Sequence, residues 1–300
     1  VGAQRGPKKT VDKKFIAVGS ALTEPTDTPW LAHAGRKIKL ISSPVGTSPD
    51  LIKSLIKQSS VQSYANEIKE GTKKGRKLIL SASRVDYTKG NEELLLAFER
   101  LLERRQDIHG KVVLMLSCVS AATGMKIYED TQRSIEEMAG RINGKFSRID
   151  WVPIRFSTKR IPYEEMIAWF TQADICWITP LRDGLNLVAK EYAAARKDRD
   201  GVLVLSEFTG ASVLLNGAIL TNPYSHRRMD EAIEEAIFME EKEQVSRMKS
   251  MTEAVESYTV DEFQAIVATS KEILKEQNLE VGTSFRAGAW LAGPNVREAI

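Results

Sequence analysis

The sequence is short of the residue types that build disulfide frameworks and metal centres. Its 300 residues include only two cysteines, Cys118 and Cys176, and both stand in apolar, strand-like runs. They read as buried thiols of a reducing compartment, which excludes a disulfide framework. The three histidines, His33, His109 and His226, are far apart in the chain and offer no metal-ligand spacing.

Long apolar runs and an excess of charge of one sign are absent as well. No stretch reaches the roughly eighteen apolar residues of a membrane span, and the first residues lack the apolar core of a secretory signal. Lysine and arginine total 43 against 40 aspartate and glutamate residues, a net charge of +3. This balance gives no electrostatic reason to bind nucleic acid. We therefore expect a soluble cytoplasmic protein with no membrane or nucleic-acid partner.

The chain does contain a regular alternation of apolar runs and amphipathic stretches, and 42% of its residues are hydrophobic. Strands are expected at 15–18, 37–41, 78–81, 112–117, 149–156, 175–178, 202–205 and 218–220. Helices are expected at 50–70, 91–105, 125–142, 163–171, 187–196, 228–240, 242–256 and 261–275. Near-continuous apolar strands alternating with helices predict an α/β fold with a doubly wound parallel sheet. Such a sheet binds ligands beyond the carboxyl ends of its strands.

The nine-residue segment Asp183–Glu191 follows an apolar run at 173–180 that is typical of a buried strand. Asn186 can cap a helix there, which places Leu187 and Val188 in the first turn. The backbone N–H groups of a first turn have no intrahelical acceptor and point outward with the positive end of the helix dipole. The segment therefore predicts a phosphate site.

Two carboxylates flank this helix start. Glu191 lies one turn beyond Leu187 on the same face, where it could accept hydrogen bonds from a sugar hydroxyl. Asp183 stands in front of the helix, where it could hold a second sugar. One segment can thus bind both the sugar and the diphosphate of a nucleotide sugar. The alternative is an ordinary strand–loop–helix crossover with a solvated Asp183 and a capping Asn186.

A basic pair follows another predicted strand. Arg84 and Lys89 leave the carboxyl end of the run at 78–81, in the right place to clamp a diphosphate. Two cations would stabilise the charge that grows on a diphosphate as a glycosidic bond breaks. Alone such a pair is more often structural, but together with the helix start and the carboxylates it makes a convergent anion site. For Glu207, after the run at 202–205, we favour a structural role over ligand contact.

Several of these segments resemble the trehalose-phosphate synthase/glucosylglycerol-phosphate synthase family. The similarity runs from about Ser43 to about Tyr258 and is carried by residues 83–90, 139–144, 179–192 and 201–208. The resemblance implies retaining, metal-independent glucosyltransferases of the two-domain GT-B type, whose domains are Rossmann-like. These enzymes need no cofactor and move glucose from a nucleotide diphosphate to a phosphorylated acceptor.

The resemblance also implies a role for each candidate residue. Arg84 and Lys89 are implied to act in catalysis by binding the donor diphosphate, and Glu191 to bind the nucleotide ribose. Asp183 and the amides that follow it are implied to hold the glucose. The substrate-binding residues after Asp183 are Gly184, Leu185, Asn186, Leu187 and Val188.

The acceptor is indicated by a local departure from the trehalose enzymes. These typically carry Ser-Arg-x-Asp-Val before the Gly-Arg-Ile-Asn-Gly motif, and the arginine helps to bind glucose 6-phosphate. Here residues 121–125 read Ala-Ala-Thr-Gly-Met, and Leu185 stands where the trehalose enzymes usually have Met. The sequence therefore resembles the glucosylglycerol-phosphate branch, which transfers glucose from ADP-glucose to glycerol 3-phosphate to make a compatible solute. The alternative is a trehalose-6-phosphate synthase using UDP-glucose and glucose 6-phosphate.

The family's first domain should precede Ser43 by about two hundred residues. We therefore interpret residues 1–42 as a remnant of the N-terminal acceptor domain, 43–260 as the nucleotide-sugar-binding Rossmann-like domain, and 261–300 as a C-terminal helix and tail. The chain is expected to be the donor-binding half of a longer enzyme. Two other readings stay open: a nucleotide-sugar-binding fragment without activity, and a regulatory pseudo-transferase, which fits poorly because every donor-site residue is present.

Overall fold

The computed structural model describes residues 16–19, 30–33, 36–42, 45–72, 75–120, 125–196 and 200–259. The chain divides into two compact units, one of Val45–Glu262 and one of Val1–Pro44 with Phe263–Ile300. In the second of these, β3 (Arg36–Ser42) pairs in parallel with β1 (Ile16–Gly19) and antiparallel with β2 (Trp30–His33). The helix expected at 261–275 and the tail lie outside the described residues.

The unit Val45–Glu262 is built on a six-stranded sheet in which all neighbours run parallel. The strands are β4 (Lys77–Arg84), β5 (Val112–Val119), β6 (Ile154–Ser157), β7 (Ile175–Ile178), β8 (Val202–Ser206) and β9 (Ile219–Thr221). Their order in the sheet is β6-β5-β4-β7-β8-β9. The predicted doubly wound parallel fold is thus confirmed. The strand order reverses between β4 and β7, and a crevice at such a point is where ligands bind in this architecture.

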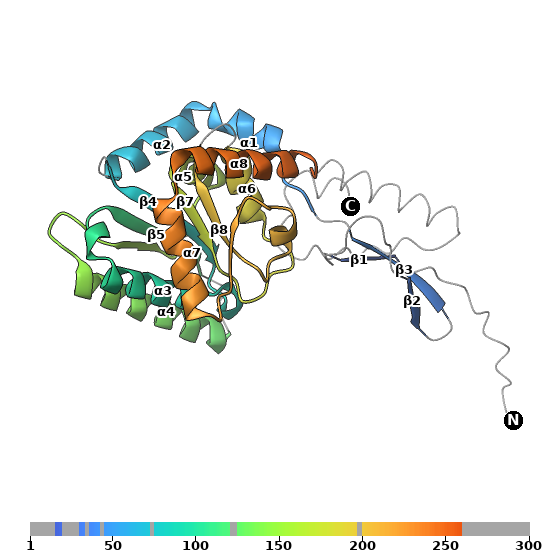
Figure 1. Cartoon of the computed structure of the whole chain (residues 1–300), viewed down its shortest axis with the longest axis horizontal. Coiled ribbons are helices and arrows are strands. Elements are labelled where there is room, and N and C mark those ends of the chain that lie inside the picture. Colours follow the sequence, from blue (N-terminus) through green and yellow to red (C-terminus); the bar gives the residue numbers. More distant parts are fainter. Residues whose placement is uncertain are drawn as a thin grey trace, which may run out of the picture. The chain divides into compact units, whose positions relative to one another are not determined.

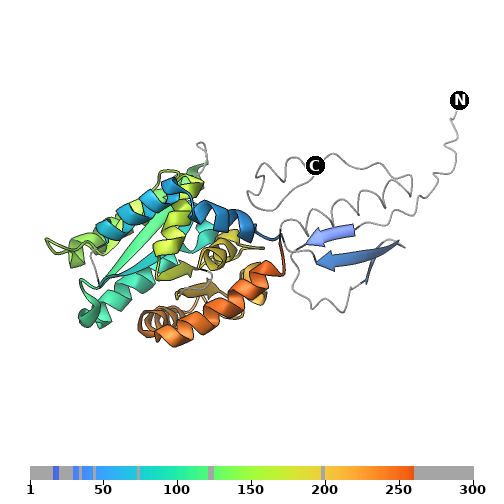
Figure 2. The same ribbon diagram turned by 90° about the horizontal axis from the view of Figure 1, so that it is seen from above.

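Helices cover both faces of this sheet (Figure 1, Figure 2). They are α1 (Pro49–Ile56), α2 (Ser59–Gly71), α3 (Asn91–Arg104), α4 (Lys126–Phe146), α5 (Tyr163–Gln172), α6 (Leu187–Ala195), α7 (His226–Phe238) and α8 (Glu241–Glu256). Short 3-10 helices occur at η1 (Tyr87–Lys89), η2 (Gln106–Ile108) and η3 (Gly210–Val213). The buried residues of α3, α4 and α7 share one hydrophobic core, and those of α1, α2, α5, α6 and α8 share another.

The strands are apolar throughout because each of their two faces meets a helical layer. In β4, Ile79 packs into the core formed with α3, α4 and α7, while Leu78 and Leu80 pack into the core on the opposite face. Successive side chains of a strand point to opposite faces, so both parities must be hydrophobic here. The free cysteines follow the same rule, since Cys118 in β5 and Cys176 in β7 are fully buried, one in each core. The buried thiols expected from the sequence are therefore confirmed.

Two sequence expectations about this unit are wrong in detail. The single helix expected at 50–70 is two helices, because the buried positions of α1 end at Leu55 and those of α2 begin at Val61. That gap of six does not fit the three-to-four spacing of one apolar stripe, and the chain turns between the two helices. The strand expected at 149–156 begins only at Ile154. A turn closed by Arg148 and Trp151 precedes it and leaves Ile149 fully exposed.

The loops that follow β4 and β7 are bonded to each other across the reversal point. Leu181 N donates to Thr88 O at 2.8 Å, and Thr179 Oγ1 donates to Gly90 O at 3.1 Å. Gly90 has a φ of 66°, and a Cβ added there would lie 1.9 Å from Thr179 O. Only glycine meets both the left-handed conformation and the close approach. This residue therefore holds the two loops at their observed separation.

Gly90→Ala is expected to lower the free energy of unfolding by about 1–3 kcal/mol or more, because the methyl group strains the backbone and collides with Thr179. The measurement is urea or thermal unfolding of the purified variant. Gly140→Ala is the matched control, since a Cβ at this position in α4 meets nothing within 4 Å. That variant should gain about 0.5–1 kcal/mol, because alanine favours a helix over glycine. Equal effects of the two substitutions would contradict the role of Gly90.

Candidate functional site

The segment predicted to bind phosphate lies at the start of α6, where Asn186 is the N-cap. Its Oδ1 accepts a hydrogen bond from Ala189 N at 3.0 Å, and its Nδ2 donates to Asp183 Oδ2 at 3.2 Å. The expected cap is thus confirmed. Among the described residues other than glycine, Asn186 is the one with a positive φ, of 69°. Within the described part of the chain, the amides of Leu187 and Val188 have no acceptor. Two N–H donors at the positive end of a helix can bind an anion.

The loop before α6 is held in place by the loop after β8. Asp183 N donates to Phe208 O at 3.1 Å, Gly210 N to Asp183 O at 3.0 Å, and Ala211 N to Leu185 O at 2.8 Å. A Cβ on Gly210 would lie 2.1 Å from Gly184 O, so the two backbones approach as closely as glycine allows. The backbone position of Asp183 is therefore set by bonds from the loop after β8 and not by its own loop alone.

Lys89 and Asp183 meet across the reversal point, with Lys89 Nζ 2.8 Å from Asp183 Oδ2. Their side chains are only 18% and 10% exposed. Lys89 ends the η1 turn, whose cap Asp86 accepts hydrogen bonds from Thr88 N at 2.9 Å and Thr88 Oγ1 at 2.8 Å. A lysine ammonium has three donors, so the pairing with Asp183 leaves protons for a phosphate oxygen. The structure thus brings together two residues that are 94 positions apart.

Arg84 is the last residue of β4 and lies at the same edge of the sheet. Its Nη2 is 3.8 Å from Asp86 Oδ2, and its side chain is 38% exposed. Asp86 therefore contacts both parts of this segment: it caps the turn that carries Lys89, and it lies beside the guanidinium of Arg84. Both cations expected from the sequence leave β4 at its carboxyl end.

Glu191 lies one turn into α6 and is partly buried. Tyr163 Oη, from the first residue of α5, donates to Glu191 Oε1 at 3.1 Å. Burial raises the pKa of the Glu191 carboxyl to about 7, and the hydrogen bond from Tyr163 opposes that rise. Burial and the nearby carboxylate also raise the pKa of Tyr163. Glu191 is therefore a carboxylate that changes its charge near neutral pH.

The neighbouring Lys190 points elsewhere. It is 1% exposed, and its Nζ donates to Val45 O at 2.8 Å. Burial lowers the pKa of this lysine to about 8. Lys190 therefore fixes α6 to the segment at which the chain enters the unit, whereas Glu191 on the same turn is bonded to Tyr163 of α5.

Taken together, the edge offers cations, free amides and carboxylates in a fixed arrangement. Arg84, Lys89 and the first turn of α6 can bind a diphosphate, and Asp183 and Glu191 can accept hydrogen bonds from sugar hydroxyls. Within the described residues, no three His, Cys, Asp or Glu side chains gather closely enough to hold a metal ion. No helix of the described part is long and apolar enough to cross a membrane.

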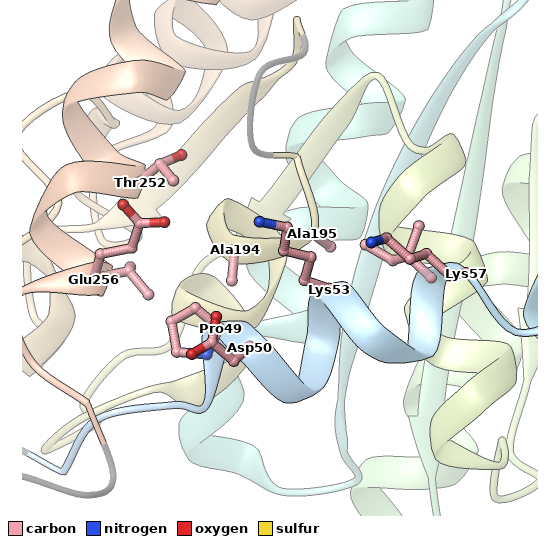
Figure 3. A pocket seen from close by; sticks show the side chains of 10 residues that line it. Pro49, Asp50, Lys53, Lys57, Ala194, Ala195, Thr252 and Glu256 are labelled. Atoms are coloured by element: carbon pink, nitrogen blue, oxygen red, sulfur yellow. The ribbon is translucent and has the colours of Figure 1, made fainter.

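A pocket elsewhere on this unit contains none of the predicted site residues. It lies between α1, α6 and α8 and encloses about 180 Å³ (Figure 3). Its lining residues are Pro49, Asp50, Lys53, Ile56, Lys57, Ala194, Ala195, Thr252, Val255 and Glu256. The volume is below the roughly 300–1,000 Å³ of sites that enclose drug-sized ligands, and a nucleotide sugar is at least that large. This hollow is thus separate from the sheet edge that carries the predicted site residues.

Sequence reasoning missed several residues that shape the site. Asp86 could have been found, because an aspartate that bonds the amide two residues on is a common turn element. Gly90 and Gly210 gave no such signal, since their close approaches involve distant backbone. The contact of Tyr163 with Glu191 spans 28 positions and could not be read from spacing. Glu207 accepts from Asn222 Nδ2 at 2.6 Å, and the structural role favoured for it stays a prediction.

Asn186→Ala should destabilise the chain by about 1–3 kcal/mol, because alanine loses the cap bond and is strained at positive φ. Asn186→Gly should lower stability by only about a few tenths of a kcal/mol, since glycine accepts this conformation and is a tolerated cap. Urea unfolding of both variants measures the difference. Equal losses would show that the backbone conformation of Asn186 carries no strain.

Comparison with known proteins adds the family. Residues 9–271 match glycosyltransferase family 20. The chain is 48% identical over 253 residues to the glucosylglycerol-phosphate synthase of Synechocystis sp., covering 84% of this chain and 50% of the relative. It is 42% identical over 287 residues to the enzyme of the same name from Pseudomonas anguilliseptica, covering 91% of this chain and 38% of that protein. The chain thus spans half or less of the length of these relatives.

Solved structures show the same architecture. The trehalose-phosphate synthase of Burkholderia xenovorans, solved with glucose-6-phosphate, superposes with a TM-score of 0.74 at 34% identity, over 83% of this chain and 54% of the other. The Escherichia coli enzyme bound to UDP-2-fluoro glucose gives a TM-score of 0.72 at 29% identity, over 85% and 56% of the two chains. With a family match over most of its length and relatives well above 30% identity, this chain belongs to glycosyltransferase family 20.

Proposed function

We propose that this chain is the donor-binding half of a retaining glucosyltransferase that moves glucose from ADP-glucose to glycerol 3-phosphate. The product is glucosylglycerol phosphate, a precursor of a compatible solute. Residues 43–260 act as the nucleotide-sugar-binding domain. The observation that carries the proposal is the meeting of Lys89 and Asp183, 2.8 Å apart, beside the free amides at the start of α6.

Each part of a nucleotide sugar has a matching group in this proposal. Arg84 and Lys89 bind the diphosphate together with the amides of Leu187 and Val188. Asp183, held in front of the helix, accepts from the glucose hydroxyls. Glu191, one turn further along α6, accepts from the ribose. The spacing along α6 supports this order, because ribose and glucose lie on opposite sides of a diphosphate.

The proposed reaction needs no side-chain nucleophile. The acceptor hydroxyl oxygen bonds to the anomeric carbon from the face on which the diphosphate leaves, and the bond between that carbon and the diphosphate oxygen breaks. The departing phosphate oxygen takes the proton of the attacking hydroxyl. Arg84 and Lys89 stabilise the negative charge that develops on the diphosphate.

The choice of acceptor is supported by sequence similarity. The glucosylglycerol-phosphate synthases of Synechocystis sp. and Picosynechococcus sp. are 48% and 49% identical to this chain, whereas the yeast trehalose-phosphate synthases are 35–36% identical. The missing arginine at 121–125 points the same way, although residues 121–124 lie outside the described part of the chain. The alternative acceptor is glucose 6-phosphate, the ligand of the solved Burkholderia xenovorans enzyme.

Arg84→Ala and Lys89→Ala should each lower the rate of glucose transfer about 10²–10³-fold in the complete protein, because each removes a cation from the leaving diphosphate. The assay measures glucosylglycerol phosphate formed from ADP-glucose and glycerol 3-phosphate. Arg227→Ala and Lys249→Ala, exposed positions on α7 and α8, are the matched controls and should keep wild-type rates. Wild-type turnover by the Arg84 and Lys89 variants would refute the clamp.

A matrix of two donors and two acceptors tests the substrate assignment. The donors are ADP-glucose and UDP-glucose, and the acceptors are glycerol 3-phosphate and glucose 6-phosphate. Of the four combinations, we expect ADP-glucose with glycerol 3-phosphate to give the highest kcat/KM. Highest activity with UDP-glucose and glucose 6-phosphate would instead identify a trehalose-6-phosphate synthase. Calorimetry of the 300-residue chain with the same donors shows whether it binds nucleotide sugar by itself. Binding without turnover would favour a binding fragment.

A further inference from the structure

The contact between Tyr163 and Glu191 lies outside the set of groups assigned so far. Tyr163 starts α5 just beyond the carboxyl end of β6, and Glu191 stands in the first turns of α6. The phenol oxygen is 3.1 Å from Glu191 Oε1, and the tyrosine is 43% exposed. Two helices that follow different strands thus meet through one hydroxyl and one carboxylate at the edge where the donor is proposed to bind.

This hydroxyl engages only one of the two carboxylate oxygens. Within the described residues, no hydrogen bond reaches Glu191 Oε2, and this atom is not a buried, unsatisfied one. A carboxylate that is fixed through Oε1 and open at Oε2 can accept from a sugar hydroxyl. The tyrosine therefore sets the direction in which the free oxygen points.

Two charged groups on these helices bond elsewhere. On α6, the Lys190 ammonium is bonded to Val45 O at 2.8 Å. On α5, Glu165 accepts from Trp169 Nε1 at 3.3 Å. Burial raises the pKa of Glu191 to about 7, and Tyr163 is the side chain whose hydrogen bond lowers it. Burial therefore has the larger effect on the pKa of Glu191, and the hydrogen bond from Tyr163 partly offsets it.

We propose that Tyr163 is a positioning residue for the donor: its hydrogen bond holds Glu191 Oε1 and turns Oε2 toward the ribose. This inference rests on the proposed function, because it needs a nucleotide sugar at this edge. It adds a residue of α5 that fixes one of the two carboxylate oxygens of Glu191.

The direction of the pH effect follows from which form of Glu191 accepts hydrogen bonds. The carboxylate can accept two ribose hydroxyl protons, whereas the protonated acid offers less acceptor capacity. Donor affinity should therefore rise as the pH increases through about 7 and level off above it. Replacing Tyr163 with phenylalanine removes the hydrogen bond that favours the charged form. The rise in affinity should then occur at higher pH, by about one pH unit.

The test is calorimetric titration of the full chain with ADP-glucose and with UDP-glucose, from about pH 5.5 to 9. Both phosphates of a nucleotide sugar are diesters and do not titrate in this range, unlike the terminal phosphate of ADP. Wild-type affinity should change up to about tenfold per pH unit below its inflection. In Tyr163→Phe the inflection of the affinity–pH curve should move to higher pH. The loss of affinity relative to the wild type should be largest near neutral pH and smaller at pH 9.

Two further variants separate the possible outcomes. Glu191→Gln should bind with an affinity that hardly changes with pH, and Tyr64→Phe, which removes a hydroxyl from α2 instead, should follow the wild-type curve. A Tyr163→Phe curve that superposes on the wild type, lies below it equally at every pH, or shows tighter binding would overturn the inference while leaving the donor site intact. A pH dependence that persists in Glu191→Gln would do the same. Failure of the wild type to bind either nucleotide sugar at any pH would reject the donor site itself.

Discussion

The Lys89–Asp183 ion pair joins the loop after β4 to the loop after β7, and the candidate site depends on this junction. The strands β4 and β7 are neighbours in the sheet. The strands that follow them lie on opposite sides: β5 and β6 beyond β4, and β8 and β9 beyond β7. A crevice opens where two such crossovers diverge. The ion pair, with the bonds Leu181 to Thr88 and Thr179 to Gly90, keeps these two loops at a fixed separation.

The pair also explains how two largely buried charges, Lys89 and Asp183, stay stable when no ligand is bound. Lys89 and Asp183 are largely buried, and an unpaired charge there would be unfavourable. Each group compensates the other while keeping unused hydrogen-bonding capacity, because the ammonium retains donors and the carboxylate retains acceptors. A ligand that offers phosphate oxygens to the lysine and hydroxyl protons to the aspartate can therefore bind without breaking the pair.

Helix α6 supplies the second half of the arrangement through residues with three different tasks. Asn186 fixes its start, Lys190 anchors it to Val45, and Glu191 presents a carboxylate beside Tyr163. Contacts at the cap and one turn later leave the helix little freedom to rotate, so its free amides and its carboxylate keep a constant spacing. A rigid first turn is what an anion site needs, since misplaced donors lose most of their effect.

The sequence by itself determined the parallel α/β fold, the buried cysteines, the cap at Asn186 and the start of α6. These follow from local causes: apolar runs on both faces of a strand, helical periodicity, and a side chain that bonds its own backbone. It also indicated Arg84, Lys89, Asp183 and Glu191 as candidates, although their roles in binding stay predictions. The break between α1 and α2 was readable in hindsight from the gap between Leu55 and Val61.

Only the tertiary structure decided which of these side chains meet. The partner of Lys89 is 94 positions away, that of Glu191 is 28 positions away, and that of Lys190 is 145 positions away. Strand order brings the first of these pairs together, the packing of α5 against α6 brings the second, and the path of the chain before α1 brings the third. Neither is encoded in local spacing, because a strand's neighbours in a parallel sheet are chosen by crossovers. For the same reason, local sequence did not show that positions 90 and 210 require glycine. At both positions the backbone of another loop occupies the space that a side chain would need.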